Sequence, residues 1–407
     1  MTKDAQPNGR RGAPRAGAST SDGRAPGARP TVSVWVLADD RPGNTTQSVG
    51  LAEALGFGFE IKRLRFTPLI RVHNRLLRTY GASRIGLRKD ASDPLVPPWP
   101  DLVISSGWRP APIACWIGKQ SRGRSVVVQL GRKGGHVPNS FDLVITCGYA
   151  HLPPDPRRIE TTAPLTRVDR KALASAAEAW KPLFAQRPRP WIGLLVGGAT
   201  RRHRWDEAVA RQLAERVRAM AEAAGGSVFA VTSRRTGQPA TEAIERGLGP
   251  EAHVSRWDPH ATANPYLGFL ALADVLVVTG ESESMLAEAA ACGKPVQIYP
   301  LPEHPPGPAA RIKDWMTRRA RQSWTSPESA PPVRRLIGRG ATALIRSGVL
   351  RPRRDLPALH AALLEAGIAS PFGAPLQPGP RPPLREADEV ARKVAQLLRS
   401  RGQLDDR

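Results

Sequence analysis

The chain has 407 residues, roughly two to three times the length of a typical domain, so two domains with appended segments are expected. Hydrophobic residues make up 41% and charged residues 24%, which is typical of globular proteins, and no apolar run reaches the length of a transmembrane helix. The three scattered cysteines (Cys115, Cys147 and Cys292) argue against a disulfide scaffold and favour a reducing, cytoplasmic location.

The formal net charge is +24, and arginine (50 residues) far outnumbers lysine (10 residues). Because Pro (41) and Gly (37) are also abundant, the composition is typical of a GC-rich genome, and we expect codon bias to account for part of this basicity. A basic balance is typical of proteins that bind nucleic acid, anionic membranes or phosphorylated ligands. Nucleic acid is not expected as a partner, since no basic patch is interleaved with aromatic side chains and the chain holds only four Tyr and eight Phe.

Residues 1–30 are polar and rich in Gly, Pro, Ala and Arg, without the apolar core of a secretory signal, and predict a disordered basic tail. From residue 31 on, short β-branched runs alternate with helical patterns, which is typical of parallel α/β units. The first series predicts an N-terminal domain over 31–185. Its expected helices cover about 45–55 and 112–119, and its expected strands are 31–37, 59–66, 101–105, 125–130 and 143–147.

A second series predicts another α/β domain over 186–305. Its expected strands are 191–196, 227–232, 274–279 and 295–299, and its expected helices are 206–224 and 283–292. The remainder, 306–407, predicts a helical C-terminal region. Its last helix, 384–400, is expected to return toward the N-terminal domain, because apolar residues recur at helical spacing: Leu384, Ala387, Val390, Ala391, Val394, Leu397 and Leu398.

The strongest functional motif spans residues 277–289. An apolar strand ends at Gly280, and Ser282 stands at the expected N-cap of a helix whose free amides and positive dipole suit a phosphate. Ser284 lies in the first turn, and Glu288 is far enough along the helix to accept hydrogen bonds from a ribose diol. The alternative is that Ser282 only caps the helix and Glu288 is solvated. The negative charges of the neighbouring Glu281 and Glu283 disfavour binding of a phosphate here.

Two further loops follow strands of the second domain, at the edge where ligands of open α/β sheets bind. Residues 232–236 offer Ser233, Arg234 and Arg235, and a guanidinium pair suits a diphosphate. Gly197 and Gly198, with Thr200, would let backbone amides approach the same ligand. The alternatives are a solvated arginine pair in an arginine-rich chain and an ordinary turn.

Loops of the first domain offer polar groups for the opposite side of a cleft. Gly43 gives access to the backbone, while Asn44 and Gln47 offer directional hydrogen bonds. The acceptor-side candidates are Arg41, Gly43, Asn44, Gln47, Ser106, Gly107 and Arg109, although each loop taken singly is more often only a loop. No catalytic base stands out, and Asp39 and Asp40 are the candidates.

Several motifs are absent from the sequence. It contains no Walker loop, no His-Glu-x-x-His and no Gly-x-Ser-x-Gly, and it lacks the three glycines of a dinucleotide fingerprint. The eight histidines are dispersed. Neither a resident cofactor nor a metal site is therefore expected.

The segment 62–89 carries nine basic residues and no acidic one. Within it, residues 68–80 place Arg71, Arg75 and Arg78 beside an apolar side, as in helices that lie on an anionic membrane surface. The charge of residues 31–150 is +8, against +3 for 151–300, which codon bias alone does not explain. The alternative is an ordinary core-packed helix with a solvated arginine face.

Four motifs together resemble the bacterial branch of the elongated-mitochondria-type (ELM-like) family of mitochondrial fission. They are Pro-Gly-Asn-x-x-Gln at 42–47, Thr-Ser-Arg-Arg-Thr at 232–236, Asn-Pro-Tyr at 264–266 and the motif at 278–289. The resemblance covers about residues 31 to 370. Where members of the family usually have Asp at the end of the strand, this chain has Glu281, which keeps the charge and lengthens its reach.

The resemblance implies a glycosyltransferase B-type α/β fold, with two Rossmann-like domains facing across a cleft and extra C-terminal helices. In such folds the second domain binds a nucleoside-diphosphate sugar and the first receives an acceptor, often at a membrane. Catalysis commonly proceeds without a metal, because basic side chains and a helix N-terminus balance the charge of the leaving diphosphate. A metal-independent glycosyltransferase-like protein, with a nucleotide sugar as substrate, is therefore expected.

Two other functions stay open. Plant relatives are implicated in organelle fission as adaptors, so a non-catalytic adaptor on the same fold is one alternative, and a nucleotide-sugar epimerase is another. An anionic membrane surface is a further expected partner, contacted through 62–89 at the inner face of the membrane. The nucleobase, sugar, acceptor and oligomeric state are not specified by the sequence.

Overall fold

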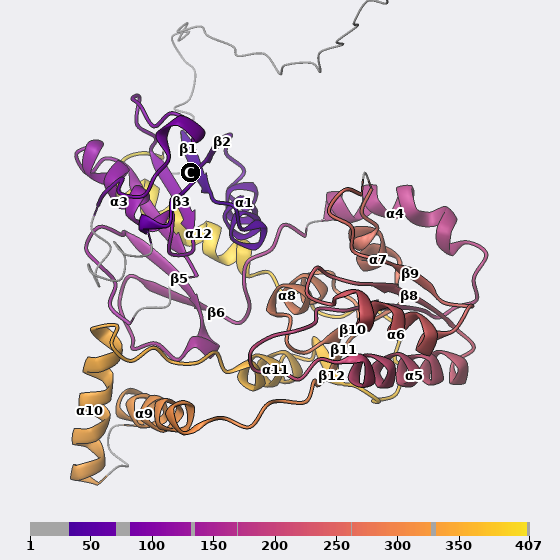
Figure 1. The fold of residues 1–407 in the computed structure, drawn as a ribbon. Helices are drawn as coiled ribbons and strands as arrows, with labels where there is room; N and C mark the ends of the chain where they lie inside the picture. Colours follow the sequence, from indigo (N-terminus) through magenta and orange to yellow (C-terminus); the bar gives the residue numbers. More distant parts are fainter. Residues whose placement is uncertain are drawn as a thin grey trace, which may run out of the picture. The chain divides into compact units, whose positions relative to one another are not determined.

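The chain folds into two parallel β-sheets of six strands each, with helices on both faces (Figure 1). The computed structural model describes residues 32–70, 82–131, 135–168, 170–261, 263–326 and 331–404. Residues 32–407 form one unit, distinct from residues 1–31. The predicted α/β class with two Rossmann-like sheets is confirmed. Within the described ranges, no helix combines the length and apolar character needed to cross a bilayer.

The first sheet has the strand order β2-β1-β3-β4-β5-β6, with every neighbouring pair parallel. The strand order changes direction between β1 and β3, so the loops after these two strands leave the sheet on opposite faces. The strands are β1 (Val34–Ala38), β2 (Phe59–Arg63), β3 (Leu102–Ser106), β4 (Val126–Leu130), β5 (Leu143–Cys147) and β6 (Arg158–Thr161).

The second sheet has the order β12-β11-β10-β7-β8-β9, again all parallel, which is the strand order of dinucleotide-binding folds read from its other edge. Its direction changes between β7 and β10. The strands are β7 (Trp191–Leu195), β8 (Ser227–Val231), β9 (His253–Ser255), β10 (Val275–Thr279), β11 (Val296–Tyr299) and β12 (Ala369–Pro371).

Each sheet is buried on both faces, which explains why its central strands are almost uniformly apolar. In the first half, α1 (Pro42–Leu55) and α12 (Glu386–Ser400) cover one face and α3 (Ala111–Gln120) covers the other. In the second, α5 (Glu207–Ala223) and α6 (Gln238–Leu248) cover one face, while α7 (Tyr266–Leu272), α8 (Glu283–Ala291) and α11 (Leu356–Glu365) cover the other.

Helix α4 (Arg170–Phe184) packs on the second sheet, although its residues lie within the range predicted for the N-terminal domain, 31–185. The Phe184 ring is fully buried and stacks on Phe229 with 3.7 Å between centroids. The side chain of Trp180 closely approaches Gly268 of α7. The chain therefore crosses between the two sheets before α4 rather than after it, because the apolar face of α4 matches the second core.

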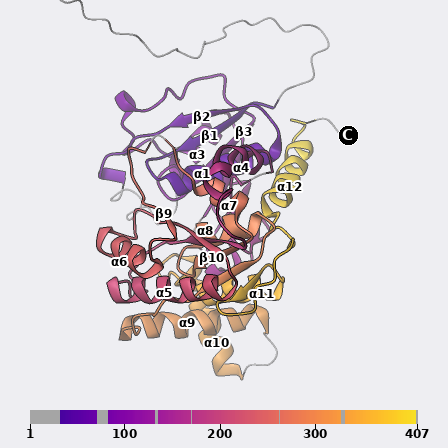
Figure 2. The ribbon, with the colours of Figure 1, turned by 90° about the vertical axis from the view of Figure 1, so that its right-hand side faces the viewer.

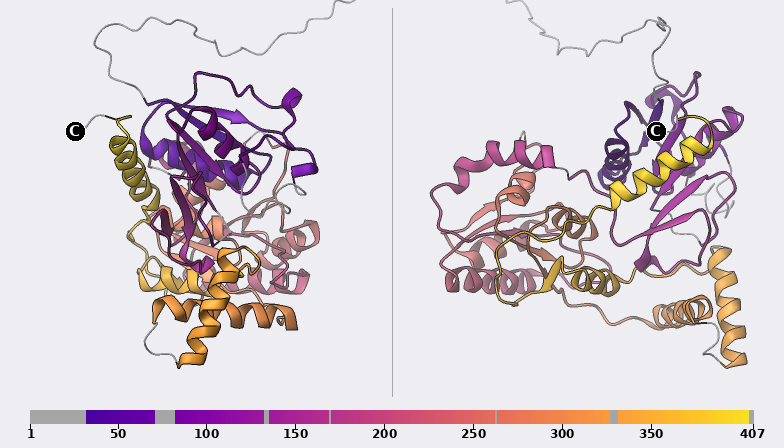
Figure 3. Two further views of the ribbon diagram at one scale, coloured as in Figure 1. Left: turned by 90° about the vertical axis from the view of Figure 1, so that its left-hand side faces the viewer. Right: turned by 180° about the vertical axis from the view of Figure 1, so that it is seen from behind.

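The C-terminal region is divided between both halves and is not a separate helical layer. Helices α9 (Pro308–Thr325) and α10 (Pro332–Arg346) pack across each other (Figure 3). Strand β12 completes the second sheet, α11 covers that sheet, and α12 lies beside the first sheet. Val390, Val394 and Leu398 of α12 are buried in the core of the first half. The sequence does not predict β12.

Candidate functional site

A cleft of about 700 Å³ lies at the carboxyl ends of strands from both sheets. In open α/β sheets ligands bind at this edge, where the strand order changes direction. On the second sheet the loops after β7 and β10 flank that point, and on the first sheet α1 follows β1. The residues that line the cleft are Gly43, Asn44, Gln47, Gly131, Thr146, Cys147, Tyr149, Ala150, Leu152, Pro164, Thr200, Arg201, Arg202, His203, Arg235, Glu281, Ser282, Glu283, Ser284, Pro352, Arg353, Arg354 and Leu356.

The Gly197–Gly198 amides, predicted to approach a ligand, are already bonded within the protein. The Gly197 amide donates to Thr279 Oγ1 at 2.9 Å, and the Gly198 amide donates to Glu281 Oε1 at 2.6 Å. A side chain at Gly197 would overlap the Glu281 carboxylate, and one at Gly198 would overlap the Arg235 carbonyl. These glycines thus serve the close packing of the two loops, and the prediction of amides free for a ligand is corrected.

Glu281 is the buried acid at the centre of this edge. Its side chain is fully enclosed, and burial raises the pKa of its carboxyl. Arg235 Nη2 lies 3.6 Å from Oε1, while Oε2 has no hydrogen-bond partner among the described residues. Ionising a buried carboxyl is costly when one of its oxygens has no hydrogen-bond donor. The Gly198 amide and the Arg235 guanidinium partly offset this cost at Oε1.

Arginine side chains from three separate segments line the cleft. Arg235 donates to Ser282 Oγ at 3.3 Å, which places its guanidinium at the start of α8. Arg354 forms an ion pair with Glu283, and Arg202 binds both Glu303 (2.8 Å) and the Arg354 carbonyl (2.7 Å). With Arg201 and Arg353, five arginines line the cleft, together with the acids Glu281 and Glu283. Arg353 is also paired with Asp314, at 2.7 Å.

Ser282 and Ser284 lie at the N-terminus of α8, as predicted, and both line the cleft. Ser282 occupies the N-cap position, but its side chain makes no capping hydrogen bond. The first amides of a helix have no partner inside the helix, so this end of α8 presents donors and positive dipole to the cleft.

Besides Gly197 and Gly198, four predicted donor-side residues lie outside the lining of the cleft. Arg234 is exposed and does not line the cleft, whereas its neighbour Arg235 does. The Ser233 hydroxyl donates to the Gly197 carbonyl and fixes the loop, and Gly280 allows His360 to approach its backbone. Glu288 accepts a hydrogen bond from the Tyr266 hydroxyl, and burial raises the pKa of its carboxyl to about 7.

The two catalytic candidates of the first domain have structural partners. Asp39 accepts hydrogen bonds from the Arg41 amide (3.1 Å) and from Asn44 Nδ2 (3.3 Å). Asp40 forms an ion pair with Arg109. Both acids therefore hold the β1–α1 loop, and neither lines the cleft.

Of the acceptor-side candidates, Gly43, Asn44 and Gln47 line the cleft. The helix expected at about 45–55 begins earlier, at Pro42, and proline is common at the first position of a helix. Arg41 and Arg109 both approach the Trp108 ring instead, at 5.8 and 5.5 Å. Ser106 and Gly107 also lie outside the lining.

Sequence reasoning missed His203, Arg202, Arg353, Arg354 and Tyr149. His203 is buried, its Nδ1 lies 2.9 Å from Thr200 Oγ1, and its Nε2 lies 3.6 Å from Glu303 Oε1. Burial lowers the pKa of this imidazole and favours its neutral form. The Tyr149 hydroxyl donates to Glu283 Oε2 at 2.6 Å and so joins the first half of the chain to α8.

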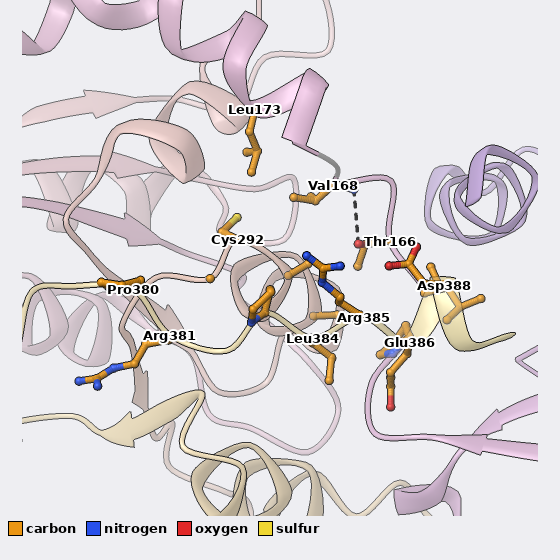
Figure 4. A pocket seen from close by; sticks show the side chains of 17 residues that line it. Thr166, Val168, Leu173, Cys292, Pro380, Arg381, Leu384, Arg385, Glu386 and Asp388 are labelled. Carbon is orange, nitrogen blue, oxygen red and sulfur yellow. Dashed lines mark hydrogen bonds between the residues drawn. The ribbon is translucent and has the colours of Figure 1, made fainter. Parts of the chain in front are cut away.

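A second cavity, of about 680 Å³, lies where the chain passes twice between the two halves (Figure 4). It is lined mainly by aliphatic and proline side chains of 164–173, the end of α8 and 380–388. The Glu386 carboxylate accepts hydrogen bonds from the Thr162 and Ala163 amides and ties the two crossings together. None of the predicted site residues lines this cavity, although the end of α8 does. We therefore assign the cavity to the connection between the two halves.

Across the described ranges, no three His, Cys, Asp or Glu side chains are grouped so as to hold a metal ion. The basic segment 62–89 is described only in part, since 71–81 and therefore Arg71, Arg75 and Arg78 lie outside the described residues. Lys62 is buried, bonded to Glu60 and placed over the Trp35 ring, which corrects its prediction as a membrane-facing cation.

The sequence model of the family described as "Mitochondrial fission ELM1" matches residues 42–333. The mitochondrial fission protein ELM1 of Arabidopsis thaliana is 30% identical over 221 residues, 49% of this chain and 51% of that protein. The chain thus spans about half the length of that relative. The uncharacterized protein RP120 of Rickettsia prowazekii is 26% identical over 301 residues, 66% of this chain and 83% of that protein.

Two solved structures of low sequence identity are also similar to the chain. MurG of Acinetobacter baumannii has a TM-score of 0.38 and 14% identity, covering 90% of this chain and 99% of that chain. A UDP-GlcNAc 2-epimerase of Neisseria meningitidis has a TM-score of 0.38 and 11% identity, covering 82% and 98%.

Proposed function

The chain belongs to the mitochondrial fission ELM1 family, and within it we propose that this protein binds a nucleoside-diphosphate sugar and transfers the sugar to an acceptor. The observation that carries the proposal is the convergence of five arginine side chains and the N-terminus of α8 on one cleft. A diphosphate carries charge that guanidinium groups bind in a bidentate manner.

The size and position of the cleft support a ligand of this class. Its volume of about 700 Å³ lies within the usual range for small-molecule sites. The hydroxyls of Thr200, Ser282 and Ser284 add neutral donors beside the cations. On the opposite wall, Asn44 and Gln47 offer hydrogen bonds to a second substrate.

Transfer of a sugar breaks the bond between its anomeric carbon and the diphosphate and forms a bond to an acceptor oxygen. The electron pair of the broken bond leaves with the diphosphate, where Arg235, Arg202 and Arg354 would stabilise the charge. The proton of the acceptor hydroxyl needs a base. We assign that role to His203, because it lines the cleft and because burial lowers the pKa of its imidazole, which favours the neutral form that a base requires.

One observation favours a non-catalytic adaptor as the second candidate. Both carboxylates considered as bases, Asp39 and Asp40, are committed to the β1–α1 loop, and His203 is only slightly exposed. An adaptor would bind a nucleotide without transferring a sugar, or it would show neither nucleotide binding nor sugar transfer.

A thermal-shift screen tests binding first, with UDP, GDP, ADP, CDP and the corresponding diphosphate sugars. A ligand at 100 times its Kd stabilises the folded chain by about 2.7 kcal/mol, which raises Tm by several degrees. If none of these nucleotides raises Tm, the proposed donor site is refuted.

Turnover is then measured as release of the nucleoside diphosphate from the sugar that binds. We expect His203→Gln to abolish release and to retain binding, whereas Arg235→Gln weakens binding itself. Binding without release by the wild-type chain, over a broad acceptor panel, would favour the adaptor.

A further inference from the structure

Helices α9 and α10, consecutive in the chain, cross each other, and this pair is called the α9–α10 hairpin here (Figure 2). The two helices pack through small residues. Gly338 of α10 lies so close to the Arg319 carbonyl of α9 that an added Cβ would sit 2.7 Å from it. Ala320, Ala341 and Ile345 are buried between the helices and Leu152 of the first half. One face of each helix is therefore committed to the fold, and the other faces are free to be solvated.

The solvated faces carry large apolar side chains. On α10, Val333, Leu336, Ile337 and Leu344 are all exposed, with Val333 at 69% and Leu336 at 72%. Residues at this spacing share one face of a helix, so they form a continuous apolar stripe. Helix α9 adds Ile312 (58% exposed) and Trp315 (42% exposed). These six residues are half of the large hydrophobic residues exposed in the described part of the chain.

The same two helices are strongly basic. Helix α9 carries five Lys and Arg residues and α10 carries four, whereas their only acidic residue is Asp314. Asp314 is itself paired with Arg353, at 2.7 Å. Across the described residues, no basic side chain of α9 or α10 forms an ion pair. Arg321 interacts with the Glu160 carboxyl from a longer distance, so most of the charge of the two helices has no paired acid within this part of the protein.

We propose that the α9–α10 hairpin docks on an anionic lipid surface. Apolar side chains flanked by arginines are typical of helices that lie in the bilayer interface, where the apolar face enters the acyl boundary and the cations contact phosphate. Trp315, with the Arg319 guanidinium 5.9 Å from its ring, suits the interfacial layer. A patch with only apolar side chains would bind neutral and anionic lipid equally well. The nine basic residues of α9 and α10 therefore favour an anionic lipid surface over a neutral one.

This surface differs from the basic segment 62–89. In the described part of that segment, Arg84 stacks on Trp116 at 4.3 Å and Arg88 pairs with Asp90 at 3.0 Å. Its exposed apolar side chains are Leu69 and Ile85. Compared with the described parts of that segment (62–70 and 82–89), the hairpin has the larger number of cations without an ion pair and the larger apolar stripe.

Vesicle co-sedimentation with the full chain tests the proposal. The probes are vesicles of phosphatidylcholine alone and of phosphatidylcholine with 30% phosphatidylglycerol, at 50 and 300 mM salt. We expect binding to the anionic vesicles only, weaker at the higher salt. The triple variant Arg334→Gln, Arg335→Gln, Arg339→Gln should weaken binding about fivefold for each cation that contacts lipid. Leu336→Ser with Ile337→Ser should weaken it independently of salt.

A matched control removes three exposed cations elsewhere: Arg211→Gln, Arg392→Gln and Lys393→Gln. Circular dichroism and gel filtration establish that each variant is folded. Retained binding in this control, with loss in the hairpin variants, supports the proposal. Absence of wild-type binding at 50 mM salt, equal loss in the control, or full binding by both hairpin variants would overturn it. Self-association that the apolar variant alone abolishes would also overturn it, since the stripe would then bury a second copy.

Discussion

The carboxyl of Glu288 makes a pH-dependent contribution to stability that can be worked out from its surroundings. It is enclosed beside Tyr266, whose hydroxyl is its hydrogen-bond donor, and burial raises its pKa from the usual 4.5 to about 7. Because the folded chain binds this proton more tightly than the unfolded chain, ionisation of Glu288 opposes folding. The cost develops as the pH rises from about 4.5 to about 7 and then stays constant.

Glu288→Gln keeps an oxygen for the Tyr266 hydroxyl and removes the charge. We expect it to raise the free energy of unfolding by less than about 1 kcal/mol at pH 5 and by about 3 kcal/mol at pH 8.5. Urea denaturation at both pH values measures the two differences. The control is Glu215→Gln on α5, an exposed carboxylate whose removal should change stability by no more than about 0.5 kcal/mol at either pH. An equal effect of Glu288→Gln at both pH values, or destabilisation at pH 8.5, would refute the reasoning.

Three further substitutions test the packing of the two halves. Phe184→Ala removes a fully buried ring and should lower the free energy of unfolding by about 3–5 kcal/mol in urea; a loss below 1 kcal/mol would mean that α4 does not belong to the second core. Glu386→Ala leaves the Thr162 and Ala163 amides without their acceptor and should cost about 1–3 kcal/mol, with Glu386→Gln closer to wild type by the same denaturation assay. Gly197→Ala places a methyl group against Glu281 and should cost about 1–3 kcal/mol, whereas Gly58→Ala, which meets open space, should change Tm little; equal effects would contradict the close packing of the β7 and β10 loops.

The central strands could be predicted from the sequence because each is a short apolar run buried on both faces. The expected 143–147 coincides with β5, and 191–196 and 227–232 exceed β7 and β8 by one residue. The three strands that sequence reasoning missed, β6, β9 and β12, all lie at edges of the sheets. Their sequences (Arg-Ile-Glu-Thr, His-Val-Ser and Ala-Ser-Pro) contain too few apolar residues to differ from loops.

The position of the cleft was predictable, but the identity of its lining was only partly so. Loops that follow parallel strands must meet at one edge of a sheet, and this placed residues near 200, 235 and 282 together. Which neighbour faces the cleft depends on packing, and Arg235 is chosen over Arg234 because it reaches Ser282 and Glu281. Arg353 and Arg354 were not predictable, because no local pattern indicates that a segment more than 50 residues beyond β11 returns to this edge.

The role of the Glu281 carboxylate could likewise not be predicted from the sequence alone. In the sequence, the negative charge of Glu281 beside the expected phosphate site disfavours binding of an anion. In the fold, its carboxylate accepts from the Gly198 amide and lies beside Arg235, so it organises the loops at the base of the cleft. Five arginine residues line the cleft around it, and Arg202, Arg353 and Arg354 among them are also paired with acids.

Titration calorimetry on two adjacent arginines tests the central claim most directly, because only one of them lines the cleft. UDP, GDP, ADP and CDP are titrated into the wild-type chain, Arg235→Gln and Arg234→Gln, which have the same change in net charge. We predict that at least one nucleotide binds wild type and Arg234→Gln with the same Kd, and that Arg235→Gln raises this Kd about tenfold or more. Absence of binding to the wild-type chain, or equal weakening by the two variants, would contradict a diphosphate site in this cleft.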